Sequence, residues 1–268
     1  MIRTRLAIAL AVSCVAAATG CSRGRPSNET FNWKGPVKAD TWLRLRNANG
    51  DFDVREGTGD SAEIRLEITR SNHYAPSAQV KVLQTADGIL ACVLFGSDNT
   101  CTADEYRSGN SATYGIIPFM RGGTKVSGTI LLPRGVKLDV ENQNGDISVG
   151  AIARDLKAST VNGDISVKGS RGPVDVHSTN GDIDADVYGM AGAVRFGTTN
   201  GDVSLTMPEA LNAALSMRTV NGELEFGLPG NVTTRTKKEI VATLDSGGAP
   251  IEISTTNGSV SVKPGGAP

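Results

Sequence analysis

Carboxylates recur at near-regular spacing in the second half of the chain and are the first residues whose type could support chemistry. Asp146, Asp164, Asp182 and Asp202 lie 18 to 20 residues apart, and Glu223 follows them. Such a row could bind Ca²⁺, which takes about six to eight oxygen ligands, or could supply a pair of carboxylates for glycoside cleavage. Each Asp also follows an Asn-Gly pair and could instead accept backbone N–H groups within its own turn. We expect this turn role and no metal or other cofactor.

Cysteine and histidine are too few to support most other sites. His73 and His177 are the only histidines, which excludes a site with many histidine ligands. Cys92 and Cys101 are the only cysteines after Cys21, and in an exported protein they are expected to form a disulfide that closes a surface loop. We therefore expect no catalytic residues and no enzymatic activity, with glycan cleavage by the carboxylates as the alternative.

The first 21 residues have the pattern of an export signal. Two arginines precede an apolar run from Leu6 to Ala18, and small residues lead from the run to Cys21. The run is too short to cross a bilayer as a mature helix, so residues 1–20 are expected to be a signal peptide that is removed. Ordinary secretion, with cleavage somewhere after Ala18, is the alternative.

The end of this leader, Ala18-Thr19-Gly20-Cys21, resembles the lipobox of bacterial lipoproteins. The resemblance implies lipid attachment at Cys21, where two or more acyl chains would anchor the protein stably. Ser22 after the cysteine implies sorting to the outer membrane, with the periplasmic or surface face left open. We expect residues 21–36 to form a lipidated tether, because the stretch that follows Cys21 is polar and lacks periodicity.

The composition indicates a β-rich domain with a narrow core. The 268 residues include 32 glycines, which is typical of many tight turns, while aromatic residues make up only 4%. A core of Val, Ile, Leu and Ala fits short stacked strands better than a thick sandwich. The formal net charge of -1 provides no basic surface for nucleic acid, so we expect no nucleic-acid partner.

Asn-Gly pairs repeat along the chain, most of them followed by an acidic residue. The repeated turns are Asn49-Gly50, Asn144-Gly145-Asp146, Asn162-Gly163-Asp164, Asn180-Gly181-Asp182, Asn200-Gly201-Asp202, Asn221-Gly222 and Asn257-Gly258. From Asn144 onward the intervals are 18, 18, 20, 21 and 36 residues. The unit is therefore about 18 residues long, with one turn lost or replaced near residues 237–246.

Each unit holds two short strands of alternating apolar residues. Because Asn-Gly is also a strong hairpin pattern, an antiparallel β-meander or sandwich is compatible with the repeat. We favour a single-stranded β-solenoid with about 18 residues per coil, since stacking coils gives the recurrence of like residues a physical use. Stacking would align one hydroxyl ladder, formed by Thr160, Ser178, Thr198, Thr219 and Thr255.

Three segments resemble the DUF4097 family of proposed adhesins: ILLPRGVKLDV at 130–140, STVNGDISV at 159–167 and IEISTTNGSVSV at 251–262. The resemblance implies a β-helix-like domain of cell-envelope proteins and supplies no catalytic residues. We expect this domain to span residues 37–263, with an irregular cap over 37–128, regular repeats over 129–263 and a disordered tail at 264–268.

Together these features predict a cell-envelope lipoprotein whose repetitive β domain is a non-catalytic binding, adhesin-like or structural module. Its expected partners are the membrane, through the lipid, and an envelope protein or glycan. The alternative is a carbohydrate-active or polysaccharide-binding solenoid, which is suggested by the row of acidic residues.

Overall fold

The computed structural model describes residues 27–71, 75–97, 99–102, 105–108, 123–189 and 191–265, and the regular structure in these ranges is all β-strand. The all-β class expected from the sequence is confirmed. The expected signal peptide and Cys21 lie outside the described residues. Within the described ranges there is no helix of the length and apolarity needed to span a membrane.

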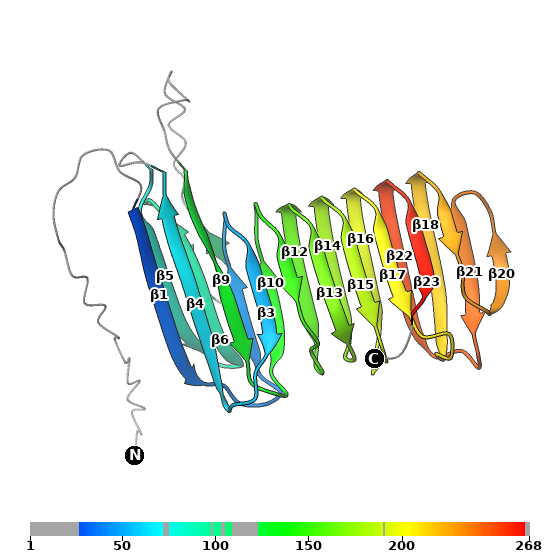
Figure 1. Ribbon diagram of the computed structural model, residues 1–268, viewed down its shortest axis with the longest axis horizontal. Coiled ribbons are helices and arrows are strands. Elements are labelled where there is room, and N and C mark those ends of the chain that lie inside the picture. The colour runs from blue at the N-terminus through cyan, green and yellow to red at the C-terminus, as the bar shows by residue number, and fades with distance from the viewer. Residues whose placement is uncertain are drawn as a thin grey trace, which may run out of the picture.

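Two large sheets lie one over the other along an elongated body (Figure 1). Sheet A contains, in spatial order, β1 (Ser27–Pro36), β4 (Ser61–Arg70), β9 (Thr124–Leu132), β3 (Phe52–Glu56), β11 (Ile147–Val149), β13 (Ile165–Ser170), β15 (Ile183–Val187), β17 (Val203–Met207), β23 (Val260–Pro264) and β19 (Leu224–Phe226).

Sheet B contains, in spatial order, β20 (Asn231–Arg235), β21 (Glu239–Leu244), β18 (Ala213–Asn221), β22 (Ala249–Asn257), β16 (Val194–Asn200), β14 (Val174–Asn180), β12 (Leu156–Asn162), β10 (Lys137–Glu141), β2 (Trp42–Arg46), β6 (Gly88–Phe95) and β5 (Ala78–Thr85). A separate small sheet pairs β7 (Thr100–Cys101) with β8 (Tyr106–Arg107).

Successive repeat units pair in parallel. Leu156 of β12 lies opposite Val174 of β14, and Ile165 of β13 lies opposite Ile183 of β15. Each unit therefore adds one strand to sheet B and one strand to sheet A. A meander of hairpins would pair successive strands antiparallel, so the parallel register favours the solenoid over that alternative.

The core lies between the two sheets and follows from the alternation of apolar residues. Side chains of a strand point alternately to its two faces, so Val174 and Val176 of β14 are buried while Asp175 and His177 lie on the outer face. Inward side chains of both sheets form one hydrophobic cluster, made mainly of Val, Ile, Leu and Ala. Phe196 is one of the few large rings that the interior accommodates.

The last repeat of the sequence is not the last coil in space. β22 pairs in parallel with β16 on one side and with β18 on the other, and β23 likewise lies between β17 and β19. In Figure 1 these two red strands lie between the yellow coil of β16 and β17 and the strand β18. The C-terminal coil is therefore inserted between two coils that precede it in the chain.

Antiparallel strands flank the parallel coils at both ends. At one end β4 pairs antiparallel with β1 and β9, and β5 pairs antiparallel with β6. At the other end β21 pairs antiparallel with β18 on one side and with β20 on the other. The β20–β21 hairpin occupies the region around residues 237–246 where the Asn-Gly period is interrupted.

Two expected boundaries are corrected by the structure. Residues 27–36, assigned above to the tether, form β1 and pair along their whole length with β4. Pro264, assigned to a disordered tail, ends β23, and the Gly265 N–H donates to the Met207 carbonyl oxygen at 2.9 Å. Residues 266–268 lie outside the described part of the chain.

The expected disulfide between Cys92 and Cys101 is present. Cys92 lies on the outer face of β6 with Leu90 and Leu94, and Tyr106 packs against these three side chains. Burial raises the pKa of Tyr106 to about 12. The disulfide therefore holds a segment that covers an apolar part of the outer face of sheet B.

Candidate functional site

The Asn-Gly turns stack into a column along one edge of the body. Each Asn side chain donates from Nδ2 to the Oδ1 of the Asn in the neighbouring coil, at 2.7 to 2.9 Å. In spatial order, the column contains Asn144, Asn162, Asn180, Asn200, Asn257 and Asn221. Its first member, Asn144, donates to the Ala48 carbonyl oxygen at 2.9 Å.

The glycine of each turn permits close approach of neighbouring coils. Gly181 has a φ of 156°, and a Cβ atom there would lie 1.9 Å from the Gly163 carbonyl oxygen. Gly145, Gly163, Gly201, Gly222 and Gly258 face the same obstruction from the carbonyl oxygen of an adjacent turn. No side chain fits at these positions, so the glycines are required by sterics.

The aspartates join neighbouring coils, which corrects the expectation that each one serves its own turn. Asp164 Oδ1 accepts the Asp182 N–H at 2.8 Å, and Asp182 Oδ1 accepts the Asp202 N–H at 2.8 Å. The column continues at Asp202, whose Oδ1 accepts the Ser259 N–H at 2.7 Å. The spacing of the aspartates cannot distinguish the two roles. A carboxylate can accept an N–H group of its own turn or the equivalent N–H group of a stacked turn.

The hydroxyl ladder has a similar role. Ser178 Oγ donates to the Gly163 carbonyl oxygen at 3.0 Å, and Thr198 Oγ1 donates to the Gly181 carbonyl oxygen at 2.9 Å. Thr160 and Thr219 lie in the same column, with Thr255 between Thr198 and Thr219. All are buried, so the repeated Asn, Gly, Asp and Thr residues bind the coils together.

The described residues hold no group of three or more His, Cys, Asp and Glu side chains placed to bind a metal ion. His177 lies on the outer face, with its Nε2 2.8 Å from Asp175 Oδ1. A Cβ atom at Gly197 would lie 2.7 Å from His177 Nδ1, so the imidazole ring packs against this glycine.

Charges alternate in sign across the outer face of sheet B. In neighbouring strands the aligned residues are Arg44, Asp139, Lys157, Asp175, Arg195 and Glu252. Arg195 Nε lies 3.1 Å from Glu252 Oε2, and Arg44 Nε lies 3.5 Å from Asp139 Oδ2. Each charge on this row has an opposite charge on the next strand, so the row is electrically balanced.

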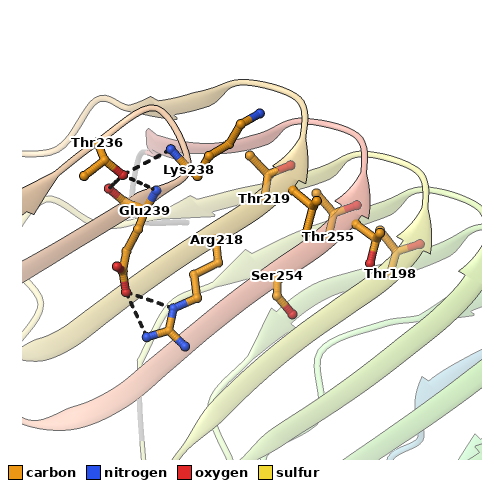
Figure 2. Close-up of a pocket in the computed structure, with 10 residues that line it drawn as sticks. Thr198, Arg218, Thr219, Thr236, Lys238, Glu239, Ser254 and Thr255 are labelled. Atoms are coloured by element: carbon orange, nitrogen blue, oxygen red, sulfur yellow. Dashed lines mark hydrogen bonds and ion pairs between the residues drawn. The ribbon is translucent and has the colours of Figure 1, made fainter.

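An open groove lies where the parallel coils meet the β20–β21 hairpin (Figure 2). It has a volume of about 460 Å³. β16, β22 and β18 form its floor, and the turn that joins β20 to β21 forms one wall. The residues that line it are Thr198, Arg218, Thr219, Val220, Thr236, Lys238, Glu239, Ser254, Thr255 and Thr256.

The wall of the groove is held in place by the turn at Thr236. Its Oγ1 accepts the N–H groups of Lys238 and Glu239, at 3.2 and 2.9 Å. Glu239 Oε1 in turn accepts from two nitrogens of Arg218, from Nε at 2.9 Å and from Nη2 at 2.8 Å. Figure 2 shows these contacts as dashed lines. The guanidinium orientation is therefore fixed by the neighbouring strand.

The other polar groups of the groove make few hydrogen bonds. Lys238 Nζ donates to the Gly222 carbonyl oxygen at 3.3 Å, a long hydrogen bond. Among the described residues, the hydroxyls of Ser254 and Thr256 take part in none of the hydrogen bonds of the groove. Val220 is 60% exposed, the most exposed large apolar side chain of the described chain. The groove thus combines cations, hydroxyls and an apolar surface.

The sequence pattern does not predict this groove. One sequence feature lies beside it, the interruption of the Asn-Gly period near residues 237–246. That interruption by itself indicates only a lost or replaced turn. A second clue is Arg218, a cation that aligns with the uncharged residues Ser254 and Gly197 on the neighbouring strands. Departures from the repeat, and not its recurring residues, mark the groove.

Residues 153–263 match the family model described as Toastrack DUF4097, which confirms the expected resemblance over this range. No curated protein matches the chain. A proposed cell adhesion protein from Clostridium sporogenes has a similar solved structure, with a TM-score of 0.46 and 9% identity over 90% of this chain and 100% of its own. A proposed adhesin from Bacteroides fragilis has a TM-score of 0.37 and 13% identity over 88% of this chain and 97% of its own.

Proposed function

We propose that this chain, whose residues 153–263 match the Toastrack DUF4097 family, is a lipid-anchored envelope protein that binds a partner without catalysing a reaction. The partner is an envelope glycan or protein. The formal net charge of -1 argues against nucleic acid, which is bound mainly through basic surfaces.

The observation that carries this proposal is the contrast between the repeat and the groove. The turn carboxylates accept backbone N–H groups of adjacent coils, and those hydrogen bonds engage one oxygen of Asp146, Asp164, Asp182 and Asp202. The groove beside Arg218 lies on paired strands of sheet B, and the hydroxyls of Ser254 and Thr256 in it have no hydrogen-bond partner in the described part of the chain. Binding surfaces supported on regular elements are well positioned for recognition.

The anchor would hold the domain close to the membrane. Because β1 begins at Ser27, only five residues lie between Cys21 and its start, which makes six steps along the chain. A fully extended chain spans at most about 3.3–3.6 Å per residue, so this link reaches roughly 20 Å. Metabolic labelling with a palmitate analogue tests the anchor: we expect label on the wild-type protein and none on Cys21→Ser. Equal labelling of both would contradict attachment at Cys21.

Binding can be tested with the mature protein in mild detergent. We expect it to co-sediment with an envelope fraction, either insoluble polysaccharide or outer-membrane vesicles. Ser254→Trp places a large ring in the groove and is expected to weaken retention at least ten-fold. Ser159→Trp is the matched control, because Ser159 lies in the same row of sheet B but outside the groove.

Two outcomes would defeat this proposal. Failure of the wild-type protein to co-sediment with any envelope fraction would remove the binding role. New reducing ends released from the polysaccharide, and lost in Asp164→Asn, would show instead that the carboxylate row cleaves glycans.

A further inference from the structure

We propose that the groove beside Arg218 binds an acidic saccharide, one that carries a carboxylate or a phosphate, with Arg218 as the partner of the anionic group. This assignment rests on the proposed binding role and names the chemistry of the ligand.

The first support is the local charge. The groove is lined by two cations, Arg218 and Lys238, and by one carboxylate, Glu239. Elsewhere on the outer face of sheet B, the aligned charges alternate strand by strand, as in the pair of Arg195 with Glu252. The groove therefore has one positive charge in excess, and this charge favours an anionic ligand.

The second support is the geometry of the guanidinium group. Arg218 Nε and Nη2 both reach the same oxygen of Glu239, and Nη1 has no hydrogen-bond partner among the described residues. The side chain is 67% exposed. A guanidinium group held by one carboxylate keeps donors for a second anion and pairs with carboxylate or phosphate through two parallel hydrogen bonds.

The third support is the surface next to this cation. Ser254 and Thr256 contribute hydroxyls that can both donate and accept, which matches the hydroxyl groups of a sugar. Val220, 60% exposed, supplies an apolar contact for the C–H face of a sugar ring. Sites for small ligands combine apolar surface with a few polar groups in this way.

The size of the groove sets the length of the bound segment. Its volume of about 460 Å³ lies near the lower end of the roughly 300–1,000 Å³ found for small-molecule sites. It is open on one side, so one or two rings of a longer chain can occupy it while the rest extends over the outer face of sheet B.

Defined saccharides test this assignment by calorimetry on the mature protein. The carboxylate probe is tri-galacturonic acid, with its fully methyl-esterified form as the neutral partner. The phosphate probe is mannose 6-phosphate, with mannose as the neutral partner. We expect at least one charged probe to bind ten-fold or more tightly than its neutral partner, and the arm that shows this preference identifies the anionic group.

Substitutions assign the preference to the groove. Arg218→Ala and Arg218→Gln are expected to abolish the preference for the charged probe, while Arg195→Ala, which removes a guanidinium from the same face outside the groove, retains it. Thermal unfolding of each variant checks that it remains folded. The Gln variant removes the charge while it keeps the first part of the side chain and a polar amide group.

The assignment is overturned if neither charged probe binds the wild-type protein, if charged and neutral partners bind equally, or if the Arg218 variants keep the preference. Envelope co-sedimentation is read independently of these titrations. A protein that co-sediments without a charge preference retains the binding role and loses only the acidic-saccharide assignment.

Discussion

Each residue of the Asn-Gly-Asp turn makes a different kind of contact with a neighbouring coil. Asn180 joins the amide column through its side chain, Gly181 lets a carbonyl oxygen approach, and Asp182 accepts an N–H group from the next coil. Because the contact partners are equivalent residues of other units, a change in one turn affects two interfaces.

The steric requirement for glycine predicts that Gly181→Ala strongly destabilises the folded protein. Its Cβ atom would lie 1.9 Å from the Gly163 carbonyl oxygen, and the backbone φ of 156° is unfavourable for alanine. We expect the free energy of unfolding to fall by roughly 3 kcal/mol or more, since the steric clash adds to backbone strain. Gly59→Ala is the control, because a Cβ atom there meets no atom within 4 Å. Urea denaturation that shows similar small losses for both variants would contradict the stacked turn.

The inter-coil role of the aspartates predicts that an amide can replace the carboxylate. Asp182→Asn keeps an oxygen that can accept the Asp202 N–H, whereas Asp182→Ala removes it. We expect a loss of about 1 to 2 kcal/mol for the alanine variant and less than half of that for asparagine. Thermal unfolding with EDTA is expected to match unfolding with millimolar calcium. A rise in Tm with calcium, abolished in Asp182→Asn, would indicate a cation site instead.

At the scale of elements, ion pairs fasten the antiparallel strands to the first coil. Arg44 of β2 donates from Nη1 and Nη2 to the two carboxylate oxygens of Asp87, at 2.9 and 2.7 Å. Asp87 lies in the turn between β5 and β6, and β6 pairs in parallel with β2. Hydrogen bonds from Arg44 lower the pKa of Asp87 to about 2.

This pair predicts a defined pH dependence of stability. The pKa of Asp87 is lower in the folded protein than its ordinary value of 3.8, so its contribution is present above about pH 4 and is lost as the pH falls toward 2. We expect NMR titration of the Asp87 carboxyl group to give a midpoint near 2 in the wild-type protein and a higher midpoint in Arg44→Ala. An unchanged midpoint in that variant would show that Arg44 is not the cause.

The edges of the sheets show a second element-scale principle. Antiparallel strands extend three of the four sheet ends: β1 in sheet A and β5 in sheet B at one end, and β20 with β21 in sheet B at the other. Sheet A ends there at the parallel strand β19. The β20–β21 hairpin additionally builds the wall of the groove, so one departure from the repeat both extends sheet B and shapes the groove.

At the scale of the whole molecule, the order of coils in space differs from their order in the chain. The coil of β22 and β23 lies between the coil of β16 and β17 and the coil of β18 and β19. It also supplies Ser254 and Thr256 to the groove. The C-terminal segment is thus an interior part of the structure.

This insertion predicts the effect of deleting residues 249–268. In a solenoid whose coils follow chain order, the deletion would remove only an end coil. Here it removes the parallel partner of both β16 and β18, so we expect the β18 amides that bond to β22 to lose hydrogen-exchange protection. The amides of β12, and those of β18 that bond to β21, are expected to keep more of it. A synthetic peptide of residues 249–268 is expected to restore protection. Unchanged protection of the β18 amides that face β22 would contradict the inserted coil.

The sequence by itself determined the class of the fold. Alternating apolar residues such as Ile165 and Val167 require a buried strand face, and the Asn-Gly period requires units that recur, because both are local properties of the chain. It also determined the disulfide, since Cys92 and Cys101 are the only cysteines after Cys21.

Only the tertiary structure decided how the coils are ordered and where the groove lies. Equivalent turns carry the same residues, so Asn257 is as good a neighbour for Asn200 as Asn221 is, and local pattern cannot rank them. Arg218 and Ser254 are 36 residues apart in the chain and aligned in neighbouring strands only because of that ordering. Contacts between residues distant in sequence depend on the free energy of the whole packed molecule, which no local period encodes.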